Sequence, residues 1–188
     1  MPEAFLIVGV FVLAAVSTAL LVVVRRRTGG TNRAGGELAG KLQARLDETH
    51  PTERTHLDTP PRVRRLEVAD RTRAGEPIYV PVVRIDFETV EPPGQELAFE
   101  FVAGVLEAIH PVLSTADVEV AHYDVEFTFG PDGLLVSRLC QRISVTPALA
   151  DRLCEEPSFR PRDLRLAVKR ADDGTSPAPA AWRECRSS

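Results

Sequence analysis

Three side chains that could do chemistry, His122, Asp124 and Glu126, occupy alternate positions in the segment HYDVE. Residues two apart on a β-strand share one face, so these three are expected to project from the same side of a sheet. An imidazole beside carboxylates can hold a metal ion or act as a general acid and base. A solvent-facing antiparallel strand, however, also carries polar residues at every second position. We therefore favour a solvated face whose charges are paired.

The residues that follow add two arginines to this face. The sequence GPDG at 130–133 predicts a hairpin with a three-residue loop. In that register Glu126 faces Arg138 and His122 faces Arg142, and the arginines neutralise carboxylates that a metal would need. Because exposed pairs contribute only about 0.2 to 1 kcal/mol, loss of both arginines is expected to change stability little. The predicted interaction face consists of His122, Asp124, Glu126, Arg138 and Arg142.

Alternating apolar and polar residues predict the sheet to which this hairpin belongs. The expected elements are strands at 62–69 and 78–90, a helix at 95–110, the hairpin at 118–145, a helix at 147–156 and a strand at 162–170. This order is typical of an α+β domain with a mainly antiparallel sheet of about five strands and two helices on one face. Pro111 is expected to end the first helix, because proline lacks the N–H that a helix needs, and His110 is expected to cap it.

The uncharged segment from Ala4 to Val24 predicts a single transmembrane helix, which makes the lipid bilayer one partner. Three arginines follow it at 25–27, whereas no Lys or Arg precedes it. The flank with more Lys and Arg normally stays inside the cell. We therefore expect a single-pass protein of the cell membrane whose soluble domain is cytoplasmic.

The predicted domain occupies residues 62–170, between a juxtamembrane linker at 25–61 and a disordered tail at 171–188. Within the linker, leucines four residues apart predict a short amphipathic helix at 37–48. That helix could lie on the membrane, pair with a second copy, dock on the domain or fray. The linker histidines, His50 and His56, are expected to be solvated.

Composition excludes some functions and leaves others open. A net charge of −4 gives no electrostatic reason to expect a nucleic acid partner. The three cysteines, Cys140, Cys154 and Cys185, form no C-x-x-C pair, so reduced thiols are expected rather than a disulfide framework or a zinc site. No motif predicts catalytic residues, and no cofactor is implied.

Three functional hypotheses fit these features. The leading one is a membrane-anchored cytoplasmic module that binds or scaffolds a protein partner of unknown identity. An enzyme at the membrane surface that uses the strand of His122, Asp124 and Glu126 is second, and a self-associating structural membrane protein is third.

Overall fold

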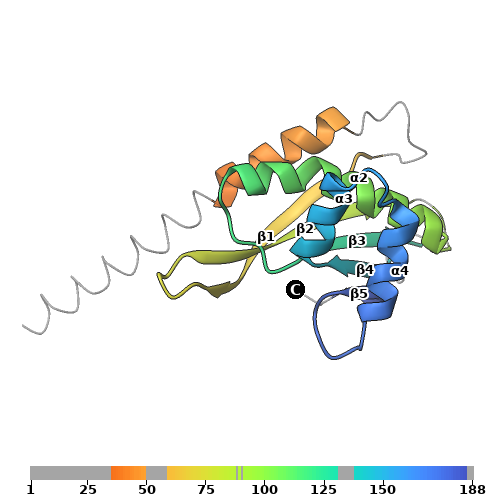
Figure 1. Ribbon diagram of the computed structural model, residues 1–188. Helices are drawn as coiled ribbons and strands as arrows, with labels where there is room; N and C mark the ends of the chain where they lie inside the picture. The colour runs from red at the N-terminus through yellow and green to blue at the C-terminus, as the bar shows by residue number, and fades with distance from the viewer. Residues whose placement is uncertain (1–34, 50–58, 88, 90, 131–137, 186–188) are drawn as a thin grey trace, which may run out of the picture. The chain divides into compact units, whose positions relative to one another are not determined.

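The computed structural model of this protein describes residues 35–49, 59–87, 89, 91–130 and 138–185 (Figure 1). The chain divides into two compact units, 1–38 and 39–188, and the fold described here is that of the second. The elements are a helix at 35–49, β1 (Arg62–Arg71), β2 (Pro77–Asp86), α2 (Gln95–Thr115), β3 (Tyr123–Phe129), β4 (Leu139–Val145), α3 (Pro147–Glu155), α4 (Pro161–Ala171) and β5 (Ala180–Glu184).

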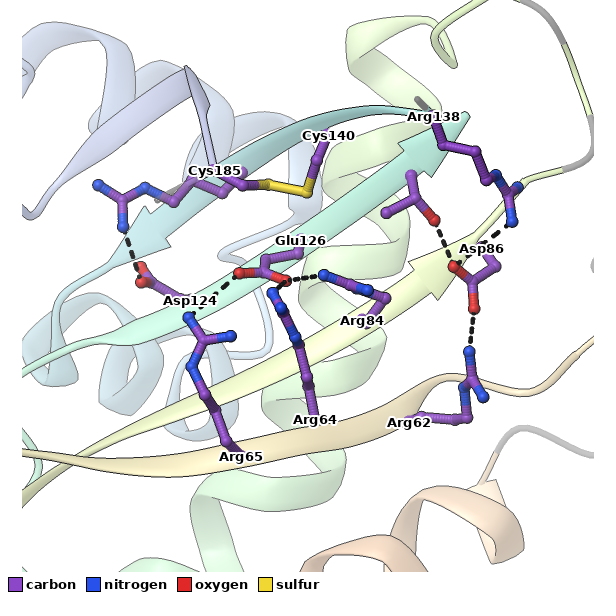
Figure 2. Close-up of polar contacts among 12 residues, drawn as sticks. Arg62, Arg64, Arg65, Arg84, Asp86, Asp124, Glu126, Arg138, Cys140 and Cys185 are labelled. Carbon is purple, nitrogen blue, oxygen red and sulfur yellow. Dashed lines mark hydrogen bonds and ion pairs between the residues drawn. A yellow bond between two sulfur atoms is a disulfide. The ribbon is translucent and has the colours of Figure 1, made fainter. Parts of the chain in front are cut away.

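The predicted α+β class is confirmed, with one five-stranded sheet in the order β1-β2-β3-β4-β5. The sheet is mixed, because β2 and β3 run parallel while the other three pairs of neighbours run antiparallel. The expectation of two helices is wrong, since the described residues form four. Helix α2 connects β2 to β3 and returns the chain to the same end of the sheet, which is the connection that parallel neighbours require. The sheet thus carries α2, α3 and α4 on one face and leaves its other face to polar side chains (Figures 1 and 2).

Helix α2 is the core helix of the domain. Its side chains Val102, Val105 and Leu106 are fully buried. Among the described residues it is also the one helix long and apolar enough to cross a membrane by length and composition. Its burial against the sheet and α3 and α4 accounts for that apolar composition. The transmembrane helix expected at 4–24 lies outside the described residues.

The prediction that Pro111 ends this helix is wrong, because α2 continues through Pro111 to Thr115. Proline removes one backbone hydrogen bond from a helix interior. The turn beyond it contributes Leu113, which is 1 % exposed, so apolar burial there favours continuing the helix. The predicted cap, His110, is consequently an interior helix residue and is buried.

The strand predicted at 162–170 is also wrong, since these residues lie in α4. Leu164 and Val168 are both fully buried, and their spacing of four fits one face of a helix as well as alternate positions of a strand. Pro161 at the first helical turn and Asp163 bonding the Arg160 backbone N–H begin the helix.

The tail predicted to be disordered contributes the fifth strand, β5, which pairs antiparallel with β4. Asp172 accepts a hydrogen bond from Ala181 N at 2.9 Å and pairs with Arg183. The ring of Trp182 lies 5.5 Å from that of Phe127. These long-range contacts order a segment whose composition alone does not favour a strand.

The helix predicted at 37–48 is present at 35–49, and from residue 39 onward it belongs to the folded unit. Leu42 and Leu46 are fully buried. The side-chain amide of Gln43 donates to Pro61 O at 3.2 Å and accepts from Val63 N at 2.8 Å. Of the four alternatives for this helix, these contacts favour docking on the domain. Gln43 thereby forms hydrogen bonds with two backbone groups at the start of the edge strand β1.

Candidate functional site

The candidate site is the polar face of the sheet, turned away from α2 (Figure 2). We call its charged side chains the arginine network. Each carboxylate of this network contacts at least one arginine, and the arginines come from β1, β2, β4 and the residue before β4. Its members are Arg62, Arg64, Arg65, Arg84, Arg138, Arg142, Glu67, Asp86, Asp124 and Glu126.

Glu126 lies at the centre of the network. Its carboxylate is 2.8 Å from Arg64 and 2.9 Å from Arg84. A third arginine, Arg65, approaches to 3.6 Å. The Glu126 side chain is only 2 % exposed, whereas the three arginines retain between 26 % and 29 % of their side-chain surface. The guanidinium groups therefore cover the carboxylate and themselves meet solvent.

Local backbone geometry explains why three arginines reach one carboxylate. The pairing of β1 with β2 shifts register between Val63 and Arg65, which is a β-bulge. A bulge re-aims side chains, and here both Arg64 and Arg65 contact Glu126 although they are consecutive. On the other strand, the parallel register sets Arg84 beside Glu126. The parallel pairing of β2 and β3 thus places Arg84 next to Glu126.

A second carboxylate, Asp124, is held by three groups. Arg142 donates to it at 3.1 Å, Ser144 donates to it through its hydroxyl, and His122 Nε2 lies 3.6 Å away. Arg142 and Asp124 are 8 % and 6 % exposed at their side chains. This pair is buried, so the expectation of a solvated face is wrong at these residues, and we now expect loss of Arg142 to destabilise the fold. Removing one partner of a buried pair leaves the other charge uncompensated.

Asp86 forms the third centre of the network, at the end of β2. Arg62 and Thr128 donate hydrogen bonds to its carboxylate, and Arg138 lies 3.9 Å away. Burial acts to raise the pKa of Asp86, but the bonds from Thr128 and Arg62 and the charge of Arg138 together lower it below its usual value. Asp86 is therefore an anion at neutral pH.

The hairpin register differs from the predicted one by four residues. Glu126 is opposite Arg142, not Arg138, and Phe129 is opposite Leu139. The connection runs from 130 to 138, and residues 131–137 within it lie outside the described residues. A shift by an even number of residues leaves every side chain on its original face. Both registers keep the apolar residues of the two strands on one face of the sheet. A shift by an odd number of residues would place some of them on the polar face.

Acid should destabilise the domain through Asp124. Burial acts to raise the pKa of this carboxyl, but hydrogen bonds from His122 and Ser144 and the charges of His122 and Arg142 lower it below its usual value. A carboxyl whose pKa is lower when folded stabilises the fold above its unfolded pKa of about 3.9. That contribution is lost as pH falls through the folded pKa.

We expect Asp124→Asn to reduce the free energy of unfolding at pH 7 and to flatten its decline below about pH 4. Urea denaturation of the wild type and the variant at a series of pH values measures both effects. Parallel curves for the two proteins across the acid range would contradict this assignment.

The polar face offers a poor site for a metal ion. Among the described residues, the one group of potential ligands with atoms within 4.8 Å of one another is Glu126 with Cys140 and Cys185. The two cysteines form a disulfide, so the expectation that they are reduced thiols is wrong. Disulfide sulfurs are not thiolate ligands, and the Glu126 carboxylate is engaged by arginines. Cys154 is free and exposed.

A second cluster of titratable groups lies on the helical side of the sheet. His110 Nδ1 is 2.6 Å from the hydroxyl of Tyr123, and Nε2 is 2.8 Å from Asp151 and 3.4 Å from Ser114. A catalytic triad needs the nucleophile and the acid on opposite imidazole nitrogens, whereas Ser114 and Asp151 share Nε2. Burial, followed by the charges of Asp151 and Cys154, raises the pKa of Tyr123, which keeps it protonated. These bonds join α2, β3 and α3.

The structure brings together the five residues predicted for the interaction face, but distributes them over three centres. His122, Asp124 and Arg142 form one, Glu126 forms another, and Arg138 lies near Asp86. Two further members of the network, Arg84 and Asp86, lie at polar positions of the strand predicted at 78–90. Sequence reasoning missed Arg84 and Asp86 of β2 as members of the site, and it also missed the residues of β1, namely Arg62, Arg64, Arg65 and Glu67. The four charged residues of the RVRRLE segment indicate that β1 contributes to a charged surface. Which groups they pair with depends on the order of the strands.

The chain matches no protein-family model, no curated protein and no solved structure.

Proposed function

We propose that this protein is a membrane-anchored binding module that holds an acidic protein partner on the polar face of its sheet. The observation that carries the proposal is an excess of arginine on this face. The arginine network contains six arginines and four carboxylates, a net charge of +2, in a chain whose formal net charge is −4. A local field opposite in sign to the rest of the chain favours an anionic partner.

The arginines are also arranged for recognition. Guanidinium groups bind carboxylates through two parallel hydrogen bonds, and they are less strongly hydrated than ammonium groups. The internal carboxylates fix several of these side chains in place, which reduces the entropy lost when a partner binds. Arg62 is the most accessible, with a side chain that is 59 % exposed. It offers a first contact at the rim, next to the partly exposed Arg64 and Arg84.

An enzymatic role for the strand of His122, Asp124 and Glu126 has less support. Each carboxylate is engaged by arginine, and both Asp124 and Glu126 are almost fully buried. A general acid or base must reach its substrate within hydrogen-bonding distance. A binding role needs only the partly exposed arginines around them.

The membrane anchor and orientation in this proposal come from the apolar segment at 4–24 and the arginines that follow it. On this basis the domain is held on the cytoplasmic side of the cell membrane. Disulfides are uncommon in the cytoplasm and, where present there, are usually transient. A cytoplasmic domain would therefore spend part of its time with Cys140 and Cys185 reduced.

Binding can be tested on the full-length protein in detergent micelles with a fluorescein-labelled peptide of alternating Glu and Ala. We expect fluorescence anisotropy to report binding that weakens as salt is added, because the contacts are between charges. Arg62→Gln should weaken binding by about 1 kcal/mol, or roughly fivefold in Kd, by removing the exposed charge at the rim.

The matched control is Arg45→Gln, since the side chain of Arg45 is 54 % exposed but lies outside the arginine network. This variant should bind as the wild type does. A peptide of alternating Gln and Ala should bind poorly to all three proteins. Equal affinity for the two peptides would exclude the polar face as a site for acidic partners.

A further inference from the structure

The Cys140–Cys185 disulfide fastens the last strand of the sheet to its neighbour. Cys140 belongs to β4, and Cys185 follows Glu184, the last residue of β5. Their Cα atoms are 5.4 Å apart, and Cys185 N donates to Cys140 O at 3.2 Å. The two cysteines are therefore direct cross-strand neighbours, and both are only half-buried. A small thiol or disulfide in solution can reach them.

The bond also lies within the candidate site. One oxygen of Glu126 and the two sulfurs are all within 4.8 Å of one another. Figure 2 shows the disulfide directly beside Glu126, with Arg64, Arg65 and Arg84 on the carboxylate's other side. The redox state of the two cysteines thus changes the chemistry at the centre of the arginine network.

Without the bond, β5 is held by a short, interrupted ladder and by contacts of its own side chains. It is an edge strand, and its ladder with β4 is interrupted between Arg142 and Ser144. Its other attachments include hydrogen bonds from Ala181 N and Arg183 to Asp172, a bond from Arg183 to Ser176 O and the packing of Trp182 against Phe127. Short edge elements with few buried contacts open at low free energy cost, so a covalent bond has a large effect on their order.

Building on the proposed cytoplasmic binding module, we propose that Cys140 and Cys185 form a thiol–disulfide switch that controls binding on the polar face. The oxidant is a low-molecular-weight disulfide such as glutathione disulfide. One cysteine thiolate attacks it to form a mixed disulfide and releases one glutathione thiolate. The second cysteine thiolate attacks the protein sulfur of that intermediate, closes the Cys140–Cys185 bond and releases a second glutathione thiolate. The two protons lost by the cysteines are taken up by the two glutathiones, to which the two electrons pass.

Oxidation favours binding of the acidic partner because it fixes the position of β5. The closed bond holds β5 beside β4, where Arg183 lies opposite Arg142 at the edge of the arginine network. A fixed strand loses less entropy when a partner binds the face beside it. Reduction frees β5, so the oxidised protein is the binding form.

Trp182 makes the switch measurable, because it is the only tryptophan in the chain and lies on β5. We expect full-length protein in micelles to show a longer emission wavelength in reduced glutathione than in glutathione disulfide, since Trp182 leaves Phe127 for water. In the same samples, the Kd for the Glu-Ala peptide should rise about tenfold on reduction, within the usual range of coupling between two sites.

Two variants serve as controls. The double variant Cys140→Ser, Cys185→Ser should give the reduced emission and the weaker affinity in both buffers. Cys154→Ser, which removes the free exposed cysteine, should respond as the wild type does. An unchanged peptide Kd in the two buffers, despite full oxidation and reduction of the wild type verified by thiol alkylation, would overturn the switch. Absence of peptide binding in both states, with the tryptophan shift intact, would instead refute the proposed acidic partner.

Discussion

Glu126→Gln should lower the free energy of unfolding by about 2 to 3 kcal/mol, one of the two largest effects we expect of side-chain replacement in this fold. The substitution keeps the shape of the side chain but removes the negative charge on which Arg64, Arg65 and Arg84 converge. Three positive charges would then repel one another across a poorly solvated centre. Because each arginine is still about a quarter exposed, solvent screening reduces the cost below that of a fully buried pair.

A matched control is Glu48→Gln in the helix at 35–49. Glu48 pairs with Arg45 at 2.8 Å, the same separation as Glu126 and Arg64, but its side chain is 66 % exposed. We expect this control to change stability by less than about 0.5 kcal/mol. Urea denaturation of the full-length proteins, followed by circular dichroism, compares the two. Equal small losses would mean that the arginine network contributes no more than ordinary surface pairs.

Replacing both Cys140 and Cys185 with serine should destabilise the oxidised domain by about 4 kcal/mol. The cysteines are separated by 45 residues, and the entropy of closing such a loop in the unfolded chain gives this magnitude. The same denaturation experiment should show little difference between wild type and double variant in a reducing buffer, where neither has the bond. Cys154→Ser should leave the oxidised stability unchanged apart from local effects. An oxidised wild type no more stable than the double variant would show that the bond does not constrain the unfolded chain.

Patterns along the chain determined the elements whose signals are local. Apolar and polar residue types alternate along the strand that carries Asp124 and Glu126, and the helix that begins at Gln95 carries a wide apolar stripe. The helix after Thr146 was correctly predicted from Pro147 at its start. In each case the residues that decide the structure are neighbours in sequence. The choice of face for each side chain in β3 was likewise determined, because burial tolerates no odd shift of register.

Local signals failed where two structures satisfy the same pattern. Leu164 and Val168 fit a strand or a helix, and the hairpin register could move by four residues without changing faces. The segment of β5 has no strand pattern, and it becomes a strand only because Asp172, Phe127 and the edge of β4 receive it. The choice between helix and strand, and between two registers, depends on long-range packing. Packing contributes more to the free energy of folding than local propensity does.

The candidate site was decided mainly by tertiary structure. The sequence by itself determined that Asp124 and Glu126 share one face of β3, because side chains alternate along a strand. Only the fold decided that α2 returns β3 parallel to β2, which sets Arg84 beside Glu126. The bulge that turns Arg64 toward Glu126 depends on pairing with β2 in the same way. Charges far apart in sequence become partners only when strand order is fixed, and strand order follows from burial of the whole sheet rather than from any segment within it.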